Sequence, residues 1–217
     1  MSHGTLTETP PATSPQRKRW TIAEFDGLHR DGYLNEGSRT YLWDGEIVEP
    51  MTVNPPHVHA VANLVDLLKE RLPRDRWTVN QDAPVVLKEG YKPQPDIIVL
   101  AGPRSSHRSK TPAPVDVVLL IEVSDSSLPK DAGGHLRAYA EAGIYEYWVV
   151  DINGRRVDAH TMPTRGEDGV ALFAKRESYG LDRAVPLSLM RDGVAEGFPA
   201  VPVAAILQDS MEPEATP

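Results

Sequence analysis

Hydrophobic and polar residues follow two different periods along the chain, and each period predicts a different kind of element. Between His57 and Leu72, apolar residues recur at every third or fourth position and Pro73 follows, which predicts an amphipathic helix. Residues 155–207 carry turn residues at short intervals, which predicts hairpins and a short terminal helix. Short runs rich in valine and isoleucine predict the strands "WTVNQ", "APVVLK", "PDIIVL", "VDVVLLIEV" and "YEYWVVD".

Capping and turn signals add three further elements. Thr21 followed by Glu24 has the spacing of a capping box and predicts a short helix. The "DG" pair within "TYLWDGEIVEPM" predicts a hairpin. Another helix is expected from about Pro129 to Ala142, because Gly143 is a typical residue just beyond a helix end.

The whole pattern predicts one α/β domain. A chain of 217 residues is long enough for one sizeable core, and alternating helices and strands place helices beside a sheet. We expect the domain to span residues 17–207. Residues 1–16 are rich in Pro, Thr and Ser, and residues 208–217 are polar and acidic, so both are expected to be disordered tails.

The composition of the chain excludes several classes of function. A net charge of −8 argues against a protein that coats nucleic acid non-specifically, since such binding uses clustered Lys and Arg. No apolar run approaches the roughly 20 residues of a membrane helix, so no membrane partner is expected. The N-terminus lacks the apolar core of a secretory signal, and a cytoplasmic location is expected. The absence of cysteine leaves oxygen and imidazole as the metal ligands.

Glu122 is unusual because it lies inside the apolar run "VVLLIEVSDSS". A strand without polar alternation is covered on both faces, where an ionised carboxylate needs a charged partner or a metal. Asp96 begins the strand "PDIIVL" directly after Pro95. If the two strands are neighbours, both carboxylates converge, and Mg²⁺ or Mn²⁺ suits this oxygen donor set. The plainer alternatives are a salt bridge from Glu122 to a helix arginine such as Arg137, and a turn-capping role for Asp96.

Four segments together carry a family resemblance. In the order "QPDIIVL", "LLIEVSDSS", "KDAGGHLRAYAEAG" and "YEYWVVD", they resemble the PD-(D/E)XK nuclease superfamily. Within it they resemble a bacterial restriction endonuclease family that was formerly described as a domain of unknown function. The resemblance covers roughly residues 20–205. It implies a restriction-endonuclease-like fold, in which helices flank a central mixed sheet, with a C-terminal β-hairpin extension.

The resemblance also implies roles for single residues. Asp96 and Glu122 match the two metal-binding carboxylates of the family, and the Val123 carbonyl matches a third oxygen ligand. Glu46, on the hairpin, and His57, at the start of the first long helix, match positions near the metal. Taken alone, Glu46 is more typical of a solvated hairpin residue, and His57 of a histidine at the edge of the core.

One position departs from the superfamily signature. The lysine expected two residues after the glutamate is replaced by Ser124. The family resembles a variant in which the lysine comes from the following helix, about one turn after an aspartate that matches Asp131, and His135 stands there. Histidine side chains titrate near pH 6.5, so His135 can act as general base or proton shuttle, with Asp131 orienting it. A half-exposed helix histidine without a role is the alternative.

The resemblance implies a metal-dependent endonuclease that hydrolyses phosphodiester bonds, with DNA as substrate and, by analogy, a homodimer as the active form. A degenerate, non-catalytic module that binds DNA or a protein partner is the main alternative, supported by Ser124 and His135. Glycoside hydrolysis by a carboxylate pair ranks last, because Glu122 lies in an apolar strand and not in an open sugar cleft. The loop "GPRSSHRSK" is expected beside the site, where its basic residues would contact phosphates; otherwise it is a solvated loop.

Overall fold

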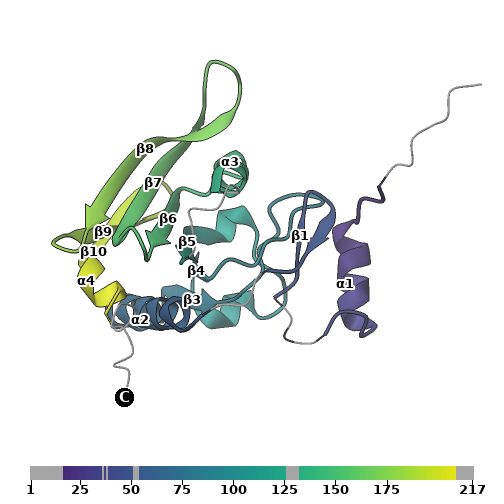
Figure 1. The fold of residues 1–217 in the computed structure, drawn as a ribbon, viewed down its shortest axis with the longest axis horizontal. Helices are drawn as coiled ribbons and strands as arrows, with labels where there is room; N and C mark the ends of the chain where they lie inside the picture. The colour runs from purple at the N-terminus through teal and green to yellow at the C-terminus, as the bar shows by residue number, and fades with distance from the viewer. Residues whose placement is uncertain (1–16, 36, 38, 51–53, 126–131, 209–217) are drawn as a thin grey trace, which may run out of the picture.

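The fold is built on one six-stranded sheet with helices on both faces (Figure 1). The computed structural model describes residues 17–208 except 36, 38, 51–53 and 126–131, so the expected tails lie outside the described residues apart from Gln208. The helices are α1 (Ile22–Arg30), α2 (Pro55–Arg71), α3 (Ala132–Glu141) and α4 (Val203–Ile206), with 3-10 helices η1 (Arg104–His107) and η2 (Pro114–Asp116). The strands are β1 (Tyr41–Trp43), β2 (Glu46–Val48), β3 (Trp77–Gln81), β4 (Ile97–Ala101), β5 (Val117–Ser124), β6 (Glu146–Asp151), β7 (Arg156–Arg165), β8 (Ala171–Gly180), β9 (Ala184–Arg191) and β10 (Val194–Pro202).

The six-stranded sheet is mixed. Its strand order is β3-β4-β5-β6-β7-β8, so each strand lies beside its neighbour in sequence. Strands β5 and β6 pair in parallel and α3 connects them, whereas the other neighbours pair antiparallel. Strands β9 and β10 form a separate antiparallel hairpin, as do β1 and β2. The predicted central mixed sheet with flanking helices and a C-terminal hairpin is therefore confirmed.

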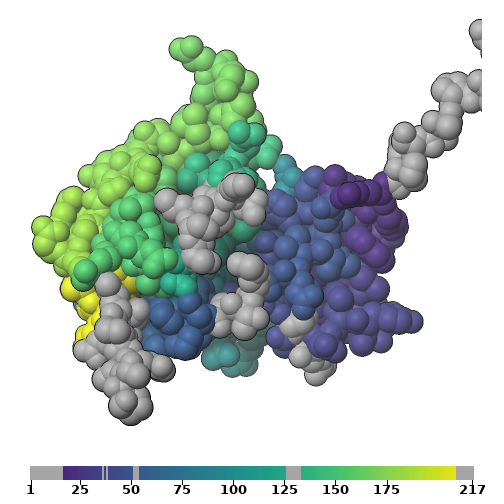
Figure 2. Space-filling model, in the orientation of Figure 1, coloured from purple at the N-terminus to yellow at the C-terminus, as the bar shows by residue number. Residues whose placement is uncertain are grey.

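A hydrophobic core lies on each face of the sheet. On one face, α2, α4 and the β9–β10 hairpin pack against residues such as Leu119 and Trp148. On the other face, α3 packs against residues such as Leu120 and Tyr147. Figure 1 shows α2 beside α4 on one side of the sheet and α3 on the other, and Figure 2 shows the loop between β7 and β8 projecting from the body. Strand β5 is buried on both faces, as its unbroken apolar run predicts.

Local sequence signals agree with several element ends. Thr21 and Glu24 form the predicted capping box at the start of α1. Asp44 and Gly45 have φ angles of 49° and 69°, the left-handed conformation that a two-residue hairpin turn requires. Gly143, with a φ of 80°, follows the end of α3. The predicted start of α3 near Pro129 lies outside the described residues.

Helix α2 begins two residues earlier than predicted. The Asn54 side chain accepts the His57 backbone N–H at 3.2 Å and caps the helix, which starts at Pro55. Asn63 on the same helix donates to the Ile206 carbonyl at 3.2 Å and so attaches α4. No helix in the described part of the chain is both long and apolar enough to cross a membrane.

The segment "APVVLK" is not a strand, which corrects a prediction. The Val85 N–H donates to the Pro93 carbonyl and the Val86 N–H to the Pro112 carbonyl, both at 3.0 Å, so these groups pair with two different loops. Val85 is nonetheless fully buried. A short apolar run indicates burial, and periodicity alone does not distinguish a buried strand from a buried loop.

The basic loop "GPRSSHRSK" does not lie beside Asp96, which corrects a second prediction. Gln81 lies opposite Ile97 and Trp77 lies opposite Ala101 where β3 pairs with β4. The loop follows Ala101, whereas Asp96 precedes Ile97. The whole of β4, roughly 17 Å of strand, separates the loop from Asp96.

Glu146 makes stability depend on pH. Glu146 is 5% exposed, and its Oε1 accepts a hydrogen bond from Trp148 Nε1 at 2.7 Å. Burial raises the Glu146 pKa from 4.5 to about 7, and the Trp148 hydrogen bond offsets only part of this effect. A carboxyl whose pKa is raised by folding favours the folded state while it is protonated, and this contribution is complete at pH values below the ordinary pKa of the group. This stabilisation is lost as the pH rises through the folded-state pKa.

We expect Glu146→Gln, which keeps an acceptor for Trp148, to raise the free energy of unfolding by up to about 3 kcal/mol at pH 8. At pH 4 the variant and the wild type should be nearly equal, because the carboxyl is then largely protonated in both states. Urea unfolding at both pH values measures the difference, with exposed Glu167→Gln as the control. An equal gain at pH 4 and pH 8 would contradict this account.

Candidate functional site

The pairing of β4 with β5 brings the two predicted carboxylates together. Ile97 lies opposite Ile121 in an antiparallel register. Asp96 precedes Ile97 and Glu122 follows Ile121, so these two residues also lie opposite one another. Residues opposite one another in an antiparallel pair project to the same face of the sheet. The two strands are neighbours, as the predicted convergence of the two carboxylates requires.

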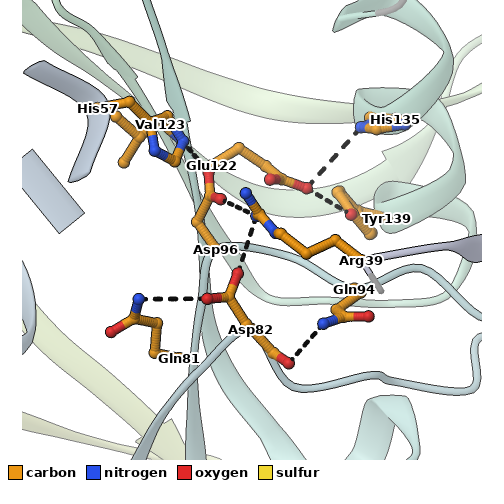
Figure 3. A network of polar contacts seen from close by, with 10 residues as sticks. All are labelled: Arg39, His57, Gln81, Asp82, Gln94, Asp96, Glu122, Val123, His135 and Tyr139. Atoms are coloured by element: carbon orange, nitrogen blue, oxygen red, sulfur yellow. Dashed lines mark hydrogen bonds and ion pairs between the residues drawn. The ribbon is translucent and has the colours of Figure 1, made fainter. Parts of the chain in front are cut away.

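Asp96 is 4% exposed, and its carboxylate contacts groups from three other segments (Figure 3). Its Oδ2 accepts the Val123 backbone N–H at 2.8 Å and lies 3.2 Å from His57 Nε2. Its Oδ1 accepts a hydrogen bond from Arg39 Nη2 at 2.6 Å. Burial alone would raise the Asp96 pKa, but His57, the Val123 N–H and Arg39 outweigh burial and lower it.

Arg39 bridges two carboxylates. The same Nη2 atom lies 2.6 Å from Asp96 Oδ1 and 2.8 Å from Asp82 Oδ1. Asp82 follows β3 with a φ of 49°, and its backbone N–H donates to the Asp96 carbonyl at 3.0 Å. The Gln94 side chain donates to the Asp82 carbonyl at 2.8 Å. The turn after β3 thus holds the Asp82 carboxylate against Arg39, as Figure 3 shows.

Glu122 faces α3. The hydroxyl of fully buried Tyr139 donates to Glu122 Oε1 at 2.8 Å, and His135 Nδ1 lies 3.8 Å from the same oxygen. Burial first and the charge of Asp96 second raise the Glu122 pKa to about 8, and the Tyr139 hydrogen bond opposes this. The two neighbouring carboxyls are therefore shifted in opposite directions from their ordinary pKa values.

His135 lies among aromatic rings at the same position. Its ring centroid is 4.3 Å from that of Trp43, 6.4 Å from that of Tyr41 and 5.8 Å from that of Tyr139. His135 and Tyr139 are one helical turn apart, on the face of α3 that meets Glu122, as the sequence predicts. Asp131, the predicted orienting residue, lies outside the described residues.

Glu46 is not part of this cluster. Its Oε1 lies 3.4 Å from Arg19 Nη1 and 3.7 Å from Arg17 Nη1, and its side chain is 46% exposed. The expected approach of Glu46 to the carboxylates is therefore not seen. His57 does reach the site, but it contacts Asp96 directly. Among the residues that the structure describes, no group of three or more His, Asp or Glu side chains is placed to hold a metal ion.

Residues 22–188 match the model of the Uma2 family, described as "Putative restriction endonuclease". The chain belongs to this family. A solved structure described as a putative nuclease belonging to DUF820, from Anabaena variabilis, shares the fold with a TM-score of 0.63. The two sequences are 12% identical, and the structural match covers 88% of this chain and 99% of the other chain. No match is found among curated proteins.

Two carboxyls of this Uma2 protein offer the kind of donor atom that a hard divalent cation takes. Asp96 and Glu122 both offer carboxylate oxygens, and Mg²⁺ is commonly held by one or two carboxylates while it keeps several waters. The raised pKa of Glu122 reflects burial and repulsion from Asp96, which a bound cation would relieve. Asp96 and Glu122 would hold the cation, and the Val123 carbonyl is the third ligand that the family resemblance implies.

Sequence reasoning missed Arg39 and Asp82. Asp82 directly follows the strand "WTVNQ", and Asp96 directly precedes the strand "IIVLA", so both are acidic residues that flank a strand. A search for acidic residues that flank strands would have found Asp82. Arg39 lies in the loop before β1, and no motif or spacing in the sequence connects it to Asp96.

We expect Arg39→Gln to lower the free energy of unfolding at pH 7 by about 2 kcal/mol, because it removes the cation from a buried carboxylate. The cost is less than that of an isolated buried charge, since Asp96 keeps the Val123 N–H and His57. Urea unfolding measures the change, and Arg30→Gln on the exposed end of α1 is the control.

A double-mutant cycle with Asp96→Asn identifies the cause. The neutral amide needs no cation, so Arg39→Gln should cost little in the Asp96→Asn background, with a coupling of roughly 1–2 kcal/mol. Strictly additive costs would show that Arg39 stabilises the fold through other contacts.

Proposed function

We propose that this protein is a metal-dependent endonuclease that hydrolyses phosphodiester bonds, with DNA as its substrate. The observation that carries the proposal is the pair Asp96 and Glu122 on adjacent strands, so close that the charge of one raises the pKa of the other. Membership in the Uma2 family supports the reaction class. By analogy with nucleases that cut two strands, the proposed active form is a cytoplasmic homodimer.

The charges of the site favour a divalent cation. Asp82, Asp96 and Glu122 carry three negative charges when ionised, and Arg39 supplies one positive charge. Two negative charges are left, which is the amount that Mg²⁺ or Mn²⁺ neutralises. When bound, such a cation supplies an activated water and neutralises charge that develops on the phosphate.

The surrounding residues have separate parts in the proposed reaction. The Val123 N–H and His57 fix the Asp96 carboxylate. Arg39 gives the site a permanent positive charge, the role of the lysine that Ser124 replaces. His135 accepts the proton of the attacking water and passes it to solvent, because it lies beside Glu122 and its side chain is 24% exposed.

A second candidate is a non-catalytic module that binds DNA or a protein partner. Two observations favour it. Ser124 stands at the lysine position of the signature. Both Asp96 oxygens already contact Arg39, His57 or the Val123 N–H. This candidate predicts no turnover in the presence of metal.

Asp96→Asn and Glu122→Gln are each expected to slow metal-dependent nicking of supercoiled plasmid by about 10³-fold or more, because each removes a charged oxygen ligand. Initial rates in Mg²⁺, Mn²⁺ and EDTA measure the effect. Glu46→Gln is the matched control, since it also removes an acidic side chain but one that contacts Arg17 and Arg19. Its rate should equal that of the wild type.

Calorimetric titration with Mn²⁺ separates the two candidates. Nicking by the wild type, together with loss of Mn²⁺ binding in both carboxylate variants, supports the endonuclease. If the wild type binds Mn²⁺ through Asp96 and Glu122 and nicks no DNA, the endonuclease is ruled out and the non-catalytic module is favoured.

His135→Gln is expected to slow nicking by about 10²-fold and to leave the Mn²⁺ affinity unchanged, because the histidine moves a proton and is not a proposed ligand. His59→Gln, an exposed histidine of α2, is the control. An unchanged nicking rate in His135→Gln would assign this histidine to packing against Trp43.

A further inference from the structure

A cavity lies at the opposite end of β4 from Asp96. Its volume is about 240 Å³, and it is formed where α2 ends, where β3 begins and where η1 follows β4. Leu72, Trp77 and Thr78 provide the buried part of its lining. Helix α2 carries both His57 and Lys69, which lines the cavity, so the two sites are roughly 18 Å apart along the helix axis.

Three basic side chains line this cavity, and each comes from a different segment. Lys69 belongs to the end of α2, Arg74 to the loop that follows and Arg104 to η1. None of the three forms an ion pair with a described acidic residue, whereas nearby Arg76 lies 2.7 Å from Glu196. Like charges gathered at one cavity repel each other and create a local positive potential, which favours a bound anion.

Trp77 lines the cavity and carries an unsatisfied hydrogen-bond donor below its surface. The residue is 3% exposed, and its indole Nε1–H is buried with no acceptor in the part of the chain that the structure describes. Buried donors nearly always have a partner, and indole is a donor only. The hydroxyl proton of neighbouring Thr78 is already donated to the Gly102 carbonyl at 2.8 Å. A ligand oxygen in the cavity would reach this buried N–H only after the indole ring moves toward the cavity.

We propose that this cavity binds a phosphoryl group. Such a group combines negative charge with several acceptor oxygens, which is what three cations at one cavity require. Its source is either the backbone of a nucleic acid or a free phosphate ester. The backbone source rests on the proposed endonuclease function, because a strand bound at Asp96 and Glu122 would reach the cavity a few nucleotides away. The binding of a phosphoryl group itself does not depend on that function.

The test uses the full chain in EDTA, so that no metal-dependent cleavage occurs. Calorimetry measures binding of inorganic phosphate, and fluorescence anisotropy measures binding of a short labelled single-stranded oligonucleotide. Arg104→Gln is expected to weaken binding about tenfold, because it removes a charge-assisted contact. Arg108→Gln is the matched control, since Arg108 is also exposed in the same loop but does not line the cavity.

Trp77→Phe tests the indole donor separately. It keeps an aromatic ring beside Phe198, whose ring centroid lies 6.1 Å away, but removes the N–H. Weaker binding by a variant with a wild-type thermal midpoint would assign the donor to the ligand. Full wild-type affinity in Trp77→Phe would remove the indole from the proposed site.

The outcomes are distinct. Phosphate binding that weakens in Arg104→Gln and not in Arg108→Gln supports the site with a free phosphate ester as ligand. The same pattern for the oligonucleotide alone supports it with the backbone as source. No binding of either probe, or equal weakening in both variants, overturns the proposal. Asp96→Asn should keep phosphate binding, so a failure of the endonuclease proposal leaves this result unaffected.

Discussion

Asp96 joins parts of the chain that are far apart in sequence. Arg39 reaches it from the loop before β1, His57 from the first turn of α2 and Val123 from β5, while the Asp82 N–H holds the Asp96 carbonyl. A buried carboxylate is costly without hydrogen-bond and charge partners, so displacement of any of these segments leaves Asp96 less well satisfied. The positions of the loop, the helix and the two strands at the site therefore depend on satisfying one buried charge.

The same constraint explains why Glu122 differs from Asp96. Asp96 has a cation in direct contact, whereas the hydrogen bond that Glu122 accepts from a side chain comes from the neutral hydroxyl of Tyr139. Two carboxyls so close together do not both ionise readily, and the one with weaker partners keeps its proton to a higher pH. An apolar residue at position 122 would suit the buried strand better. An acidic residue that conflicts with its surroundings in this way is characteristic of a functional site.

Site residues on strands that pair with their neighbours in sequence could be predicted, whereas a site residue from a distant loop could not. Asp96 and Glu122 could be found because each interrupts or begins an apolar strand, and strand pairing is largely local in sequence here. Arg39 could not be found, because its position depends on how the loop before β1 reaches Asp96 and Asp82. The segment "APVVLK" was misplaced because hydrophobicity indicates burial but does not distinguish a buried strand from a buried loop. The loop after β4 was misplaced because the length of β4 separates the two ends of the strand.

Arg39 also changes how the chemistry is divided in the proposed reaction. In the superfamily signature one lysine near the glutamate both polarises the attacking water and stabilises charge. Ser124 stands at that position and has no positive charge with which to do either. Arginine supplies the charge and bridges two carboxylates, but it does not lose its proton in proteins, so it cannot serve as a base. Proton transfer must then fall to another group, and His135 is a titratable side chain within 3.8 Å of Glu122. Two roles of one lysine are thus assigned to residues from two distant segments, and each segment must be in place for the reaction to proceed.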